Sequence, residues 1–262
     1  MYFLKINKQR ILMVAFISSV IAVLFGLLSG AVPFEHFVSA LETSIYFSND
    51  PLTVWAMVLF CIPYILFLTP LTGFFKQDFN IQTIYCFTRR KNYLEWYLKK
   101  SASLAAQALF SQLLFFGLCI VTVFCIADFP RESIAASAAF TLQAFALAWL
   151  FVFAFAFLMN ALSFFASSKW ILPAGVTFFT ANAFLLPFSI EHESFLRYLN
   201  PIVHINMTMH EGAHPLFAQY SQMAPGLKFW HSVLFFLAII AVSFAAGYLK
   251  ISRSDLGLML DD

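Results

Sequence analysis

The feature that most constrains this chain is a set of six long stretches that contain no Asp, Glu, Lys or Arg. A helix needs about 20 consecutive apolar residues to cross the hydrocarbon core of a bilayer. The stretches that reach this length are residues 11–32, 52–75, 101–127, 133–168, 170–190 and 229–249. We therefore expect an all-α integral membrane protein with six transmembrane helices.

The composition agrees with lipid as the main solvent of the chain. Only 11% of the 262 residues are charged and 61% are hydrophobic, whereas a soluble domain carries about 25% charged residues. The formal net charge of +2 is too small to indicate a nucleic-acid partner. Stretch 133–168 is too long for one upright span and too short for two, so we expect one tilted helix there. With no internal repeat and no linker, residues 1–262 are expected to form a single transmembrane domain.

The distribution of basic residues predicts the orientation of the spans. Twelve of the fifteen Lys and Arg residues lie before the first span, in the connections after the second and fourth spans, or after the sixth span. Cytoplasmic segments of membrane proteins carry an excess of Lys and Arg. Both termini and connection 76–100 are therefore expected to be cytoplasmic, and segment 191–228 external. The setting that we expect is a cell membrane, such as the plasma membrane of a bacterium.

Connection 76–100 ends in a basic and aromatic segment. Thr88 can cap a helix that continues to Lys100, and Glu95 and Lys99 are then spaced for an i,i+4 ion pair. Three cations would occupy its first turn, where the helix dipole disfavours each of them by up to about 1 kcal/mol. Lipid headgroups or a protein partner would have to compensate. The cations are Arg89, Arg90 and Lys91, and the apolar face after them consists of Leu94, Tyr97 and Leu98, flanked by Tyr93 and Trp96.

This layout resembles an ABC-2-type transporter permease. The matching features are the six spans, the basic-aromatic segment "FTRRKNYLEWYLKK" after the second span, and the short turn "ASSKWILP" between the fourth and fifth spans. The stretch "YLNPIVHINM" after the fifth span and the tail "YLKISRSDLGL" also match. The resemblance implies an exporter subunit in which segment 191–228 forms short re-entrant helices at the outer gate.

The resemblance also implies partners. In that family the segment after the second span carries a coupling helix, which docks in a cleft of a separate ATP-binding subunit. The implied contacts are Arg89, Arg90, Lys91, Tyr93, Leu94, Trp96 and Tyr97, with a second, smaller contact at Ser167, Ser168 and Lys169. The chain has no G-x-x-x-x-G-K-[ST] motif, so the partner subunit would bind ATP and Mg and this chain would not be an enzyme by itself. Six helices form half of the usual pathway, which implies a second permease, identical or paired.

The spans contain few polar groups. They hold no Asp, Glu, Lys, Arg or His except His231, at the outer edge of the sixth span. Because charged groups in a membrane usually mark ion or proton pathways, their absence argues against ion coupling. Neutral polar residues either face a translocation path or form hydrogen bonds between helices. The candidates for the path are Gln107, Ser111, Asn160 and Asn182. The 35 Phe residues suit a hydrophobic or amphipathic substrate, and they equally suit packing.

The connection before the sixth span contains the pattern His-Glu-x-x-His at His210, Glu211 and His214. On a helix this spacing lets two imidazoles bind zinc, with the glutamate as general base. Gly212 and Pro215 both weaken such a helix, and the sequence specifies no third ligand. An integral membrane zinc metallopeptidase is therefore the alternative function, and a non-catalytic membrane immunity or scaffold protein is the third. Histidines here could also serve a pH-sensitive gate.

Overall fold

The computed structural model describes residues 8–29, 54–76, 79, 93–126, 133–212 and 214–253, and these residues form helices and turns without any strand. The long helices are α1 (Lys8–Ser29), α3 (Val54–Leu68), α5 (Tyr93–Ile126), α6 (Ser133–Leu162), α7 (Ser168–Glu191) and α10 (Phe229–Arg253). The short helices are η1 (Thr69–Leu71), η3 (Phe195–Leu199), α8 (Pro201–Ile205), η4 (Met207–Met209), η5 (Pro215–Phe217) and α9 (Ala218–Ser221).

Four helices are long and apolar enough to cross a membrane. They are Tyr93–Cys125, Ser137–Leu162, Lys169–Glu191 and Phe229–Arg253, and each overlaps one of the predicted spans. The remaining two stretches overlap α1 and the shorter apolar segment Phe60–Lys76, which contains the second half of α3 and the turn after it. The chain is therefore an all-helical, membrane-embedded protein.

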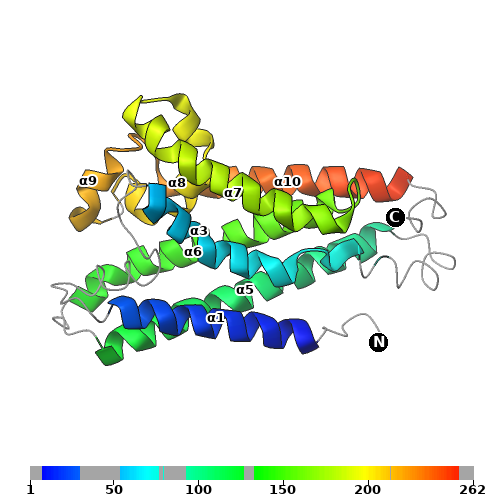
Figure 1. The fold of residues 1–262 in the computed structure, drawn as a ribbon, viewed down its shortest axis with the longest axis horizontal. Helices are drawn as coiled ribbons and strands as arrows, with labels where there is room; N and C mark the ends of the chain where they lie inside the picture. The colour runs from blue at the N-terminus through cyan, green and yellow to red at the C-terminus, as the bar shows by residue number, and fades with distance from the viewer. Residues whose placement is uncertain are drawn as a thin grey trace.

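The long helices lie roughly side by side (Figure 1). Helix α1 packs along α5, α5 packs on α6, α6 packs on α10, and α3 packs on α7. The first residues of α1, α5 and α7 lie at the same end of the bundle as the last residue of α10, and we call this the terminal end. The opposite end carries η3, α8, η4, η5 and α9, and we call it the loop end.

Two helix boundaries differ from the sequence prediction. Residues 93–100 do not form a helix separate from the span, because α5 continues without interruption for 34 residues. At 1.5 Å per residue it is about 51 Å long, more than the hydrocarbon core of about 30 Å. Helix α6 ends at Leu162 instead of continuing to residue 168. Its end is fixed by Ser163, whose hydroxyl donates to the Asn160 carbonyl at 2.6 Å and competes with the helical bonding pattern.

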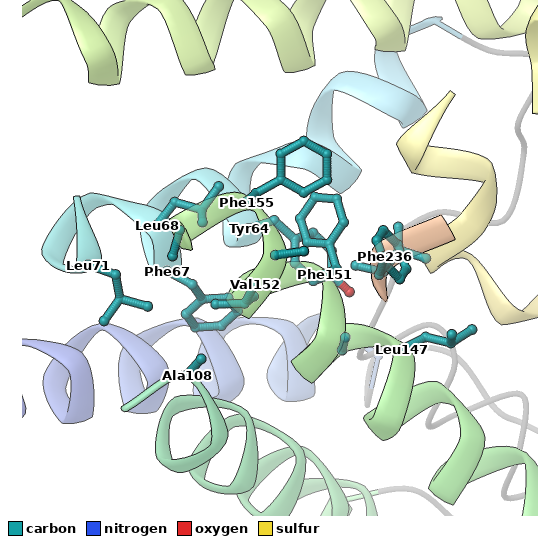
Figure 2. Close-up of a cluster of buried hydrophobic side chains, with 14 of the residues drawn as sticks. Tyr64, Phe67, Leu68, Leu71, Ala108, Leu147, Phe151, Val152, Phe155 and Phe236 are labelled. Atoms are coloured by element: carbon teal, nitrogen blue, oxygen red, sulfur yellow. The ribbon is translucent and has the colours of Figure 1, made fainter. Parts of the chain in front are cut away.

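Aromatic rings fill the middle of the bundle (Figure 2). The ring of Phe151 on α6 lies 5.2 Å from Tyr64 on α3, 5.4 Å from Phe179 on α7 and 5.8 Å from Phe236 on α10, measured between centroids. Lipid tails are as apolar as these side chains, so excluding water contributes little inside a membrane. Close packing of the rings, at about 0.5–1.5 kcal/mol per pair, therefore holds the helices together here.

Candidate functional site

The first two turns of α5 have a buried side and an exposed side. Trp96 is 4% exposed and Tyr97 is fully buried, whereas Leu94 is 41% and Leu98 is 50% exposed. On the same exposed side, Lys99 Nζ lies 2.6 Å from Glu95 Oε1, which confirms the predicted i,i+4 pair. The predicted apolar face is therefore not buried as one surface, because Tyr97 is buried while Leu94 and Leu98 are exposed.

The buried side of this segment enters a group of rings that we call the aromatic cluster. The Tyr97 ring lies 5.3 Å from Phe75, 5.8 Å from Phe157 and 5.0 Å from Phe244. The cluster consists of Phe75, Phe79, Trp96, Tyr97, Phe157, Phe164, Phe244 and Tyr248. These rings come from the segment after α3, from α5, from α6 and the turn that follows it, and from α10. They connect the start of α5 to three other parts of the bundle.

Tyr97 and Gly247 fit together closely. The Tyr97 hydroxyl donates to the Ser243 carbonyl of α10 at 3.4 Å. A Cβ atom at position 247 would overlap that hydroxyl and would also press on Ala161 Cβ. Glycine at 247 therefore allows the ring to reach the backbone of α10.

The turn between α6 and α7, which was the second predicted contact, lies beside the first. Phe164 in this turn packs 5.8 Å from Phe79, and Phe79 packs 5.6 Å from Trp96. Ser168 begins α7, and Lys169 next to it is exposed. Phe79 thus links residues 93–100 to the turn at 163–169, while Arg89, Arg90 and Lys91 fall outside the described residues.

Trp96 and Tyr97, two of the predicted partner contacts, are buried inside the chain. The surface that remains for a partner is the exposed side of the same two turns, with Leu94, Glu95, Leu98 and Lys99. Sequence reasoning could not find the buried side, because the rings that cover it lie far away along the chain.

The polar residues predicted for a translocation face have partners within the chain. Gln107 Nε2 donates to Ser103 Oγ at 3.3 Å, and the Ser111 hydroxyl donates to the Ala108 carbonyl at 2.7 Å. The amide of Asn182 donates to the Phe178 carbonyl of its own helix at 2.8 Å.

Asn160 stabilises a break in the backbone of a neighbouring segment. After α3, the chain tightens into η1 and then turns at Gly73, which has a φ of 69°. The Asn160 amide donates to the Leu71 carbonyl at 2.7 Å, and its Oδ1 accepts from the Phe75 N–H at 2.9 Å. A backbone group without a partner costs several kcal/mol where no water is available. Asn160 therefore replaces hydrogen bonds that the broken helix loses.

At the loop end, three polar residues spaced by six start successive short helices. Ser194, Asn200 and Asn206 each accept a hydrogen bond from the backbone N–H two residues ahead, at 3.0–3.3 Å. Such side chains satisfy the free N–H groups at a helix start. The recurring spacing in "SFLRYLNPIVHINMT" was a sequence signal for these turns that our prediction of the segment did not use.

The His-Glu-x-x-His pattern does not lie on a helix. His210 follows the end of η4, Gly212 has a φ of 74°, and the next short helix begins at Pro215. The Glu211 N–H donates to the Leu227 carbonyl at 2.7 Å, so the chain turns away at this point. Among the described residues, no group of three or more His, Cys, Asp or Glu side chains is placed to hold a metal ion.

The ring of His210 instead belongs to a buried group that we call the histidine cluster, which consists of His204, Ser232 and His210. The Ser232 hydroxyl lies 2.8 Å from His204 Nδ1 and 2.7 Å from His210 Nε2. The outer nitrogens face carbonyls: His204 Nε2 lies 2.8 Å from Tyr198 O, and His210 Nδ1 lies 3.0 Å from Asn206 O. Burial lowers the pKa of both imidazoles, that of His210 to about 4.

No family model, no curated protein and no solved structure matches this chain.

Proposed function

We propose that this chain is the transmembrane permease subunit of an ATP-driven ABC transporter. In this proposal a separate ATP-binding subunit, carrying ATP and Mg, docks at the terminal end, and a second permease completes the pathway. The substrate is hydrophobic or amphipathic, and it moves outward.

The observation that carries the proposal is the construction of α5. Its first two turns present an exposed side at the terminal end, while the opposite side is packed into the aromatic cluster. Because α5 is one continuous helix of 34 residues, a displacement of residues 93–100 would move the whole span. The aromatic cluster would pass that displacement on to α6 and α10. A subunit that receives mechanical work from a partner needs such a connection.

The charge distribution supports this docking direction. Among the described residues, Lys99 and Lys100 lie in the first two turns of α5, Lys169 lies at the start of α7, and Lys250 and Arg253 lie in the last turn of α10, so all five lie at the terminal end. The loop end carries Arg197 and Lys228. The excess of basic residues favours a cytoplasmic terminal end, where ATP is available.

The exposed side of α5 gives a sharper test than Trp96, because truncating a buried ring would also damage packing. In Leu98→Ala, we expect the chain to assemble normally but to lose most of its copurification with the ATP-binding subunit and most of its stimulation of that subunit's ATPase activity. Leu249→Ala is the matched control. Leu249 lies on α10, in the part of that helix at the terminal end, and is 47% exposed.

Three results would contradict the proposal. The first is equal retention of the ATP-binding subunit by both variants. The second is that no nucleotide-binding protein copurifies with the wild-type chain. The third is chelator-sensitive peptide cleavage by the isolated chain, which would favour the metallopeptidase.

A further inference from the structure

The hydrogen positions in the histidine cluster follow from its acceptors. A carbonyl oxygen can only accept a hydrogen bond, so the ring nitrogen that faces it must carry a hydrogen. His204 Nε2 therefore donates to Tyr198 O, and His210 Nδ1 donates to Asn206 O. A neutral imidazole has one N–H only. When both rings are neutral, His204 Nδ1 and His210 Nε2 are consequently bare acceptors, and both face the Ser232 hydroxyl.

The neutral cluster is one hydrogen short. Ser232 has a single hydroxyl hydrogen, which it can donate to one histidine. The other contact, at 2.7 or 2.8 Å, then places two lone pairs opposite each other. Changing the tautomer of either ring moves this mismatch to a carbonyl without removing it, because four contacts share three hydrogens. All three side chains are almost fully buried, so water is not at hand to relieve the mismatch.

One added proton satisfies all four contacts. The protonated ring donates from both nitrogens, one to its carbonyl and one to Ser232 Oγ, and Ser232 donates to the neutral ring. Hydrogen bonds from a charged donor are about twice as strong as neutral ones. A second proton would leave the Ser232 hydrogen without an acceptor in the cluster and would place two positive rings around one hydroxyl.

We propose that His204, Ser232 and His210 form a binding site for one proton, which the two imidazoles share through the hydroxyl when the loop end is acidified. Bound there, the proton tightens the junction between α8, η4 and α10. This inference does not depend on the proposed transport function, because it concerns a property of the folded chain alone.

The surroundings oppose a second proton. Helix α6, which packs against α8 and η4, contains no titratable side chain between Ser133 and Leu162. At the loop end, the other surrounding elements carry these titratable groups: Glu191, His192 and Glu193 at the end of α7, Arg197 and Tyr198 on η3, Glu211, His214 and Tyr220 after η4, and Lys228 and His231 at the start of α10. Burial, which is the largest cause, and the positive charges of the neighbouring His204 and His231 together lower the pKa of His210 to about 4, against the backbone hydrogen bonds that raise it.

The experiment is a pH titration of the full-length chain, labelled with ¹⁵N in its histidine rings and held in lipid nanodiscs. Histidine-to-glutamine variants assign the signals of His204 and His210, and the ¹⁵N shifts report which ring nitrogens carry hydrogen. Ser232→Ala removes the shared hydroxyl. Ser243→Ala is the matched control, because Ser243 is buried on the same helix and its hydroxyl has no hydrogen-bond partner among the described residues.

At pH 8 we expect hydrogen on His204 Nε2 and on His210 Nδ1. Between pH 7 and pH 4.5, the two rings should shift together and gain one proton in total. That uptake should disappear in Ser232→Ala and persist in Ser243→Ala. The proposal is overturned if the wild-type rings gain two protons, gain none, or titrate independently, and also if Ser232→Ala leaves the shared uptake unchanged. The wild-type proton count decides the question even if Ser232→Ala fails to fold.

Discussion

The two ends of the molecule hold their helices together by different means. At the terminal end, the aromatic cluster joins α5 to α6 and α10 through many ring contacts at 5.0–6.5 Å between centroids. At the loop end, the histidine cluster joins His204 of α8 and His210, which follows η4, to Ser232 of α10 through two polar contacts at 2.8 and 2.7 Å. Ring contacts are individually weak and do not depend on protonation. The hydrogen bonds of the histidine cluster, in contrast, depend on how many protons its two imidazoles carry. The first end is therefore suited to transmit displacement, and the second to respond to acidity.

The largest effect should come from removing a central ring of the aromatic cluster. Tyr97→Ala should lower the free energy of unfolding by about 3–5 kcal/mol, because it opens a cavity among packed rings. SDS titration of the purified chain measures this. The adjacent exposed substitution, Leu98→Ala, should change stability by less than about 0.5 kcal/mol. Similar losses for both variants would show that the first turns of α5 are not anchored on one side.

A comparable effect should follow when the broken segment after α3 loses its polar support. Asn160→Leu leaves the Leu71 carbonyl and the Phe75 N–H without their side-chain partner, at about 1–3 kcal/mol for each group. Asn182→Leu is the matched control, because the Asn182 amide donates only within its own helix. It should cost under about 1 kcal/mol on the same assay. If Asn160→Leu and Asn182→Leu lowered the free energy of unfolding equally, Asn160 would not be supporting the backbone of the segment after α3.

The fit between Tyr97 and Gly247 can be tested with two equivalent glycine substitutions. Gly247→Ala should cost about 1–3 kcal/mol, because the new methyl group overlaps a ring that has no room to move. Gly175→Ala meets only the flexible end of Met159, so it should be nearly neutral. Adding Tyr97→Phe to Gly247→Ala should recover part of the loss. If the double variant were no more stable than Gly247→Ala alone, that result would argue against contact between the Tyr97 ring and Gly247.

The smallest effect is the change in stability for each pH unit of acidification, and it distinguishes the two ends. Unfolded histidines titrate near 6.5, while burial holds the pKa of both cluster histidines lower in the folded chain. Stability should therefore be fully present above pH 6.5 and fall as the pH drops toward 4, because the unfolded chain binds more protons.

With one proton kept by the folded cluster, the loss should be about 1.4 kcal/mol per pH unit, and without it about twice that. Ser232→Ala should show the steeper loss, and Tyr97→Phe should keep the wild-type slope. A wild-type slope as steep as that of Ser232→Ala would contradict the shared proton.

What the sequence could predict followed from local chemistry. Long apolar stretches correctly indicated the four long membrane helices, and the Glu95–Lys99 spacing correctly indicated an ion pair. The buried side of α5 could not be predicted, since it depends on Phe75 and Phe244, which are remote in sequence. The histidine cluster was missed for the same reason: Ser232 is 22 residues beyond His210, and the His-Glu-x-x-His pattern drew attention to a helix that Gly212 and Pro215 prevent.

The most direct test of the account is the accessibility of position 98 in a cysteine-free background. Leu98→Cys should react with a membrane-impermeant thiol reagent in inside-out vesicles but not in intact cells. The reaction should be suppressed when the ATP-binding subunit is co-expressed. Labelling in intact cells, or labelling in inside-out vesicles that the ATP-binding subunit does not reduce, would contradict a cytoplasmic docking surface on α5.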